Sequence, residues 1–200
     1  MFNDSENTYR KVRKIKAVAD GAGIGEQPRS GPPTCSRRSR DGSSQARSRK
    51  RLSVKPKRYL ADPSLAVAQL GMGPESLLSD WQTFGLAFEA MCVRDLSVYA
   101  RALPGVGFEP VRYYRDDSGL EADAVVELAD GRWAAFEAKV GEDRVGAAVD
   151  SLRRLRAKLC SNPASRTRPP EFMAVIVGAS RCAREVEEGI YVIPLRCLGA

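Results

Sequence analysis

Four charged residues stand at the ends of two adjacent apolar runs. In the stretch GLEADAVVELADGRWAAFEAKV, residues 119–140, Glu121 and Asp123 open the first run, and Glu137 and Lys139 close the second. Side chains two residues apart in a β-strand share a face. We therefore expect Glu121, Asp123 and Val125 to share one face, and Glu137 and Lys139 to share another. If the two faces coincide, Asp123, Glu137 and Lys139 converge at one end of a sheet.

Two carboxylates that converge inside a sheet repel each other, and burial raises the cost of their charges. Either one of them takes up a proton or a cation lies between them. Mg²⁺ binds one or two carboxylates, keeps several waters and completes its shell with phosphate oxygens. A nearby lysine can stabilise developing charge or orient the attacking water. The pattern of Asp123, Glu137 and Lys139 thus favours phosphate chemistry with Mg²⁺ or Mn²⁺.

Catalytic sites that depend on histidine are excluded by composition. The 200 residues contain no histidine, so the chain has neither a Ser-His-Asp nor a Cys-His site, and no zinc site that uses histidine. The cysteines are odd in number, widely spaced and without a CxxC pair, which predicts mostly free thiols in a reducing compartment. They are Cys35, Cys92, Cys160, Cys182 and Cys197.

The positive charge belongs to the N-terminal part of the chain. Residues 1–58 carry a net charge of +11 and residues 59–200 a net charge of −4, which together give +7. Residues 21–53 are rich in Gly, Pro, Ser and Arg and lack apolar periodicity, so we predict a disordered basic tail over residues 1–56 and one domain over residues 57–200. The tail either binds nucleic acid or another polyanion, or is a solvated arm with no partner.

Nothing in the sequence suggests a membrane or a nucleotide site. No apolar run approaches the roughly 18 residues of a membrane span, and the N-terminus lacks the apolar region of a secretory signal. We therefore predict a cytoplasmic protein that does not contact a membrane. The GAGIG of residues 21–25 has no Lys-Ser/Thr after it and no strand before it, so we predict no ATP site.

The periodicity predicts an α/β fold in which a mixed sheet is flanked by helices. Asp62 and Pro63 open a short helix, and an apolar stripe from Phe84 to Leu103 marks a longer one. GVGFEP, residues 105–110, is expected to form a turn. The apolar run at 172–178 requires helices on both faces of the sheet. The expected elements are helices at 80–103 and 142–159 and strands at 111–115, 121–128, 132–140, 172–178 and 189–195.

These residues resemble a known superfamily. Asp123, thirteen intervening residues and then Glu137-Ala138-Lys139 look like the D…ExK core of the PD-(D/E)XK nuclease-like superfamily, and Glu89 matches the acidic residue that many members carry on the preceding helix. KRYLADPSLA, GLAFEAMCVRDL, RYYRDDSGLEADAVVE and AAFEAKV resemble, in order, the uncharacterised C-terminal domain of many prokaryotic AAA-type ATPases. That resemblance covers roughly residues 57–197.

The resemblance implies a restriction-endonuclease-like core. It implies Glu89, Asp123 and Glu137 as ligands of Mg²⁺ or Mn²⁺ and Lys139 as the basic member of a catalytic site, with Glu121 and Arg115 as flanking polar residues. Such a domain either cleaves phosphodiester bonds in nucleic acid or is an inactive module that binds nucleic acid, an ATPase or another protein. The sequence leaves the oligomeric state open.

The chain departs from the family pattern in two respects. Ser64 stands where the family often has glycine, and the ATPase module is missing, which suggests a truncated or frameshifted relative.

Simpler roles are also open for individual residues. Glu89 could be an exposed helix residue, and Arg115 could pair with Asp116 or Asp117 in water. The arginine-rich face of the helix at 142–159 is either a solvated surface or a track for a nucleic-acid backbone.

Overall fold

The computed structural model describes residues 59–116, 118–161 and 167–198. The predicted tail at 1–56 lies outside these residues. Within them, Cys92, Cys160, Cys182 and Cys197 are free, which confirms the prediction of free thiols for these four. No helix in this part of the chain combines the length and the apolar character that crossing a membrane requires.

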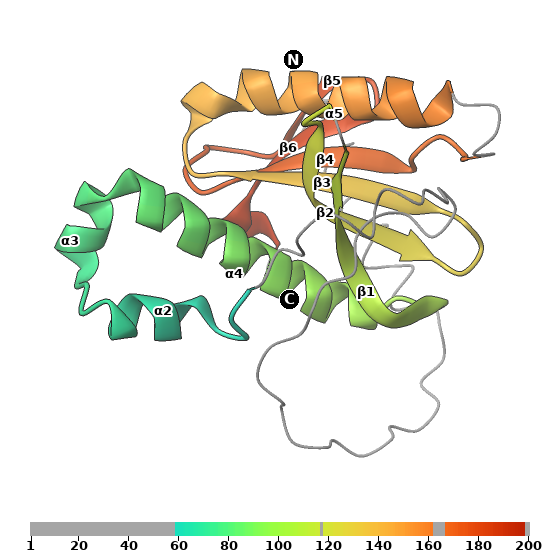
Figure 1. Cartoon of the computed structure of the whole chain (residues 1–200). Coiled ribbons are helices and arrows are strands. Elements are labelled where there is room, and N and C mark those ends of the chain that lie inside the picture. The colour runs from blue at the N-terminus through green and yellow to red at the C-terminus, as the bar shows by residue number, and fades with distance from the viewer. Residues whose placement is uncertain (1–58, 117, 162–166, 199–200) are drawn as a thin grey trace.

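A six-stranded mixed sheet forms the centre of the fold (Figure 1). The strand order is β1-β2-β3-β4-β6-β5. β3, β4 and β6 run parallel to one another, whereas β1, β2 and β3 form an antiparallel meander and β5 is antiparallel to β6. The strands are β1 Val106–Arg115, β2 Glu121–Leu128, β3 Trp133–Lys139, β4 Phe172–Val177, β5 Arg184–Glu187 and β6 Ile190–Pro194.

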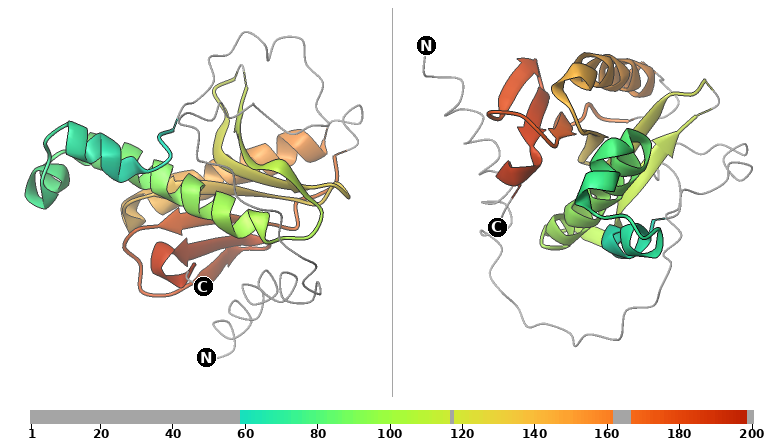
Figure 2. Two further views of the ribbon diagram at one scale, coloured as in Figure 1. Left: turned by 90° about the horizontal axis from the view of Figure 1, so that it is seen from below. Right: turned by 90° about the vertical axis from the view of Figure 1, so that its left-hand side faces the viewer.

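One long helix covers each face of the sheet (Figure 2). α4 packs against β1, β2 and β3 on one face, and α5 packs against β2, β3, β4 and β6 on the other. Two short helices, α2 and α3, precede α4 and contact it. The helical segments are α2 Pro63–Gln69, α3 Pro74–Ser79, α4 Trp81–Arg101, η2 Glu142–Arg144, α5 Val145–Cys160 and η3 Leu195–Cys197. This arrangement confirms the predicted α/β fold.

Aspartates that precede α2 and α4 fix where these helices begin. Asp62 accepts a hydrogen bond from the backbone amide of Ser64, with Pro63 as the first helical residue. Asp80 accepts hydrogen bonds from the amides of Gln82 and Thr83. Such side-chain acceptors satisfy amides that have no partner within the helix. The predicted starts of both helices are therefore confirmed.

β4 contributes to the core on both faces of the sheet. Met173 and Val175 pack in the cluster under α5, whereas Ala174 and Ile176 pack in the cluster under α4. All four are fully buried. The expectation that helices cover both faces of this strand is confirmed. In the sheet, β4 lies between β3 and β6.

One local prediction is wrong, and two short elements were not predicted. The residues expected to turn at 105–110 belong mostly to β1, which begins at Val106 and pairs there with Leu128. β1 is an edge strand, where Pro110 removes no ladder hydrogen bond that the sheet needs. Neither α3 nor β5 was expected. β5 has the sequence REVE and α3 has only six residues, so neither carries a readable apolar period.

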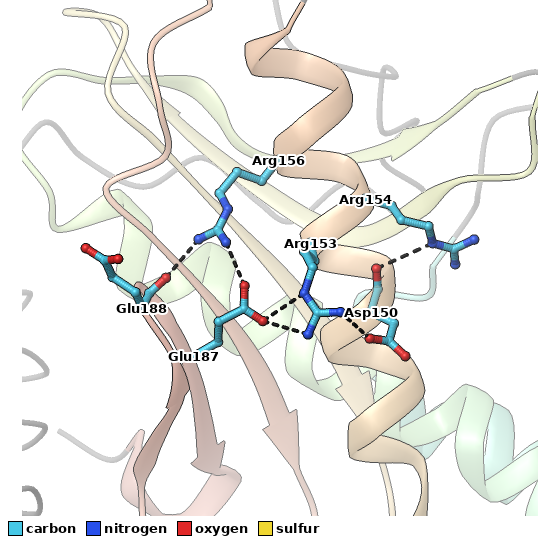
Figure 3. A network of polar contacts seen from close by, with 6 residues as sticks. All are labelled: Asp150, Arg153, Arg154, Arg156, Glu187 and Glu188. Carbon is cyan, nitrogen blue, oxygen red and sulfur yellow. Dashed lines mark hydrogen bonds and ion pairs between the residues drawn. The ribbon is translucent and has the colours of Figure 1, made fainter.

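A network of arginines and acids ties the β5–β6 hairpin to α5 (Figure 3). Arg153 and Arg156 of α5 each donate to the carboxylate of Glu187 at 2.8 Å. Arg156 also donates to the backbone carbonyl of Glu188 at 2.8 Å, and Arg153 to the side chain of Asp150 at 2.7 Å. Two arginines of the basic face of α5 are thus engaged within the domain.

Candidate carboxylate-lysine site

The site lies where β2 and β3 stop pairing. The ladder between these strands ends at the pair Ala124 and Phe136. On the other side of β2, Arg112 pairs with Val125 whereas Tyr114 pairs with Ala122. Two steps along β1 therefore match three steps along β2, which is a bulge of one extra residue in β2.

The bulge corrects one expectation about side-chain direction. Ala122 and Val125 both pack in the cluster under α5, although residues three apart in a regular strand point to opposite faces. The alternation assumed from Glu121 through Asp123 to Val125 is therefore wrong, because the extra residue interrupts it. Asp123, Glu137 and Lys139 nevertheless lie close together, as expected.

Asp123 is held by the neighbouring strand. Its side chain is buried, and its Oδ2 accepts a hydrogen bond from the backbone amide of Ala138 at 2.9 Å. The carboxylate thus partners an amide at the place where the ladder has ended. The same Oδ2 lies 3.6 Å from Nζ of Lys139.

Glu137 and Lys139 form a close ion pair on β3. Nζ of Lys139 lies 2.7 Å from Oε2 of Glu137, whose residue is 5% exposed. From α5, the hydroxyl of Ser151 donates to Oε1 of Glu137 at 3.3 Å. Sequence reasoning missed Ser151, because one serine on an amphipathic helix carries no signal. The ammonium group of Lys139 thus contacts both buried carboxylates.

The electrostatics of the site follow from this crowding. Burial and the negative charge of Asp123 raise the pKa of Glu137 to about 7, although Lys139 acts in the opposite direction. Burial alone would lower the pKa of Lys139, but the carboxylates of Asp123, Glu137 and Glu89 outweigh it and raise that pKa. The site therefore favours a proton or a cation beside its carboxylates.

Glu89 reaches the same region from α4 through a residue that the sequence did not single out. The hydroxyl of Tyr59 donates to Oε1 of Glu89 at 2.5 Å. Burial, this hydrogen bond and the charges of Glu89, Asp123 and Glu121 raise the pKa of Tyr59. A lone tyrosine before the first helix has no pattern that could have identified it. Glu89 is therefore hydrogen-bonded rather than simply solvated.

The two flanking residues pair with each other. Nε of Arg115 lies 3.0 Å from Oε1 of Glu121, across the β1–β2 ladder. Pairing of Arg115 with Asp116 is not observed, since Asp116 accepts from Nζ of Lys158 at 2.6 Å. Arg115 and Glu121 are both partly exposed, so their pair contributes little to stability. Asp117 lies outside the described residues.

Two carboxylates of the site fit a hard divalent cation. Asp123 and Glu137 are buried and close enough for one to raise the pKa of the other, a cost that a cation between them would relieve. Within the described residues, however, no group of three or more potential ligands is arranged to hold a metal ion. The structure thus brings Asp123, Glu137 and Lys139 together and places Glu89 within their electrostatic influence.

A buried cysteine lies near these charges. Burial, with the negative charges of Asp95, Asp123 and Glu89, raises the pKa of the Cys92 thiol to about 12. The thiolate is the reactive form of cysteine, so this residue is inert at neutral pH. Cys92 therefore belongs to the packing of α4 and not to the chemistry of the site.

Comparison with known proteins identifies the family. The model of the family DUF4143, "Domain of unknown function (DUF4143)", matches residues 84–198, and the chain belongs to this family. No curated protein matches the chain. The description of this family names no function, so the resemblance to a domain of AAA-type ATPases stays a prediction. The finer assignment to the PD-(D/E)XK nucleases remains a prediction.

One solved structure is similar to part of the chain. It is the "Refined half-complex from tetradecameric assembly of Thermococcus gammatolerans McrB AAA+ hexamers with bound McrC", with 16% sequence identity and a TM-score of 0.31. The similarity covers 68% of this chain and 42% of the other, so the chain spans less than half of that protein's length.

Proposed function

We propose that this domain hydrolyses phosphodiester bonds in nucleic acid with the help of Mg²⁺ or Mn²⁺ held by Asp123 and Glu137. The observation that carries the proposal is the position of Lys139, whose Nζ lies within 4 Å of both buried carboxylates. Two acids and one base at the end of neighbouring strands supply the groups that metal-assisted hydrolysis needs. The resemblance of Asp123 and Glu137-Ala138-Lys139 to the D…ExK core supports the same chemistry.

Each side chain has a role that follows from its contacts. The hydrogen bond from Ala138 fixes the direction of the Asp123 carboxylate, and Ser151 restrains Glu137. A bound divalent cation would acidify water and neutralise charge on the phosphate. Glu137 must lose its proton to bind the cation, and its raised pKa makes binding depend on pH near neutrality.

Lys139 is the group best placed to serve the substrate. Its ammonium group is paired with both carboxylates, and it would be available to a substrate if Asp123 and Glu137 held a cation. The charged end can then contact a phosphate oxygen and stabilise the negative charge that develops there. Lys139 is about one third exposed, so a substrate can reach it without opening the core.

Nucleic acid is the proposed substrate, with a protein of the AAA-type ATPase class as the proposed partner. Residues 1–58 carry a net charge of +11 and would attract a polyanion in a salt-dependent way. The partner is suggested by the family resemblance, since that domain occurs in AAA-type ATPases. Glu89 is the proposed third acidic residue of the site.

Cleavage assays on the full chain test the proposal. Labelled single- and double-stranded DNA and RNA are incubated with the protein and Mn²⁺ or Mg²⁺. We expect cleavage by the wild type and by Lys158→Met, a control whose ion pair lies elsewhere, and a loss of 100-fold or more in Asp123→Asn and Lys139→Met. Cleavage that survives both substitutions would show that this site does not perform it.

A second candidate function is an inactive nuclease-like module that binds nucleic acid or a protein. The observation that favours it is the ion pairing of Lys139, which already compensates the carboxylates without a metal. This function predicts no cleavage by the wild type and equal binding of labelled nucleic acid by wild type and Asp123→Asn. Fluorescence anisotropy with the same substrates measures that binding.

A further inference from the structure

Tyr59 lies beside the carboxylate-lysine site but outside residues 84–198, which the family model matches. Its hydroxyl reaches across thirty residues of sequence to Glu89, at 2.5 Å. A hydrogen bond to an ionised carboxylate is short and comparatively strong. The segment before α2 is therefore attached to α4 at the residue that the resemblance assigns to the site.

The packing of α4 places Glu89 near the other two acids. Phe88 and Cys92 of α4 are buried in one cluster with Ala124 and Phe136. Ala124 follows Asp123 directly in β2, and Phe136 precedes Glu137 directly in β3. The turn of α4 that carries Glu89 thus lies over the strand ends that carry Asp123 and Glu137.

The electrostatic effects agree with this geometry. The negative charge of Glu89 contributes to the raised pKa of Lys139, and the charges of Asp123 and Glu121 contribute to that of Tyr59. These charges therefore act on one another, as the packing of α4 over the strand ends allows. Tyr59 is partly buried, which restricts the phenol to few orientations.

We propose that Tyr59 is a positioning residue, which holds the carboxylate of Glu89 toward Asp123 and Lys139 so that its negative charge adds to that of the site and favours a bound cation. The role in cation binding rests on the proposed function, whereas the hydrogen bond between Tyr59 and Glu89 is independent of it. A glutamate on a helix surface has several rotamers, and a fixed donor selects one of them. Without the phenol, Glu89 would spend more time in water.

Chemical labelling tests the positioning without any metal. The full-length wild type, Tyr59→Phe and Tyr99→Phe are treated with a carbodiimide and an amine, and the labelling rate of each carboxylate is read by mass spectrometry. Tyr99 is the matched control, because it is also partly buried and lies on α4 ten residues beyond Glu89, about 15 Å along the helix. We expect Glu89 to label at least threefold faster in Tyr59→Phe only.

Calorimetric titration with Mn²⁺ tests whether the positioning of Glu89 by Tyr59 strengthens metal binding. We expect Tyr59→Phe to weaken Mn²⁺ binding several-fold, Glu89→Gln to weaken it at least as much, and the double variant to bind like Glu89→Gln alone. Tyr99→Phe should bind like the wild type. A Tyr59→Phe variant with wild-type affinity, beside a weakened Glu89→Gln, would overturn the inference.

The two measurements separate failure of the inference from failure of the proposed function. If the wild type binds no Mn²⁺, the metal site is wrong, and the labelling of Glu89 alone decides whether Tyr59 positions it. If Glu89 labels equally in wild type and Tyr59→Phe, the positioning role is wrong even where Mn²⁺ binds.

Discussion

The carboxylate of Asp123 accepts a hydrogen bond from the backbone amide of Ala138 at 2.9 Å, at the place where β2 and β3 stop pairing. Asp123 is therefore part of the sheet as well as of the site. Asp123→Ala should destabilise the domain by about 1 to 3 kcal/mol, because it leaves a buried amide without a partner. Asp123→Asn retains an acceptor oxygen and should cost less. Urea denaturation of both variants measures the difference.

Equal stability of Asp123→Ala and the wild type would contradict this account of Asp123. The same comparison decides which variant suits functional assays. Asp123→Asn removes the charge while it keeps an acceptor oxygen for the amide of Ala138, so it is the better variant for functional assays if its urea denaturation matches that of the wild type.

Glu137 should make the stability of the domain depend on pH. Its pKa is about 7 in the folded protein and near the ordinary 4.5 when unfolded, so the folded state holds the extra proton between these values. Stability contributed by this group is therefore present at low pH and lost as the pH rises through about 7. Each pKa unit corresponds to about 1.4 kcal/mol. Melting temperatures in EDTA from pH 4.5 to 8.5 measure the effect.

Glu137→Gln is the matched variant for that experiment, because glutamine resembles the protonated acid. The difference in melting temperature between this variant and the wild type should grow in favour of the variant as the pH rises from 5 to 8. A difference that is constant over this range, or that grows in favour of the wild type, would show that Glu137 titrates normally.

Lys139 should contribute strongly to stability at high pH. Lys139→Met leaves two buried carboxylates without their cation, which typically costs about 3 to 5 kcal/mol. The loss should be smaller at pH 5, where Glu137 is protonated. Lys158→Met is the control, since Lys158 is half exposed in its pair with Asp116 and such pairs contribute about 1 kcal/mol or less. Denaturation at pH 5 and pH 8 tests both, and an equal effect of the two substitutions would be inconsistent with a buried site.

Glu187 should stabilise the β5–β6 hairpin in a salt-dependent way. Glu187→Gln removes the carboxylate shared by Arg153 and Arg156 (Figure 3). These groups are partly exposed, so we expect a small loss of stability in low salt that disappears in 0.5 M NaCl, which is roughly several times the physiological ionic strength. Thermal melts at both salt concentrations measure it, and a loss that persists in high salt would indicate a packing role.

Much of the fold could be predicted because its core elements carry strong periodic signals. The buried residues Phe88, Cys92 and Leu96 of α4 recur every four residues, and β4 is apolar throughout. The turn could also be predicted from the Asp130-Gly131 pair, and Gly131 adopts a positive φ of 82°, a conformation that favours glycine. These signals come from burial and backbone sterics, which act locally along the sequence.

The remaining features depend on contacts between distant residues. The bulge in β2 lies between Ala122 and Val125, and the residue types in this segment do not predict it. Ser151 and Tyr59 touch the site from fourteen and thirty residues away in sequence. The convergence of Asp123 with Glu137 and Lys139 was readable because a hairpin joins their strands.

Calorimetric titration of Mn²⁺ into the full-length protein and into Asp123→Asn shows whether Asp123 and Glu137 form a cation site. We expect saturable binding by the wild type, weaker at pH 5.5 than at pH 8 because Glu137 must lose its proton, and no binding by Asp123→Asn. Binding that Asp123→Asn retains, or its absence in the wild type at both pH values, would contradict the claim that these carboxylates form a cation site.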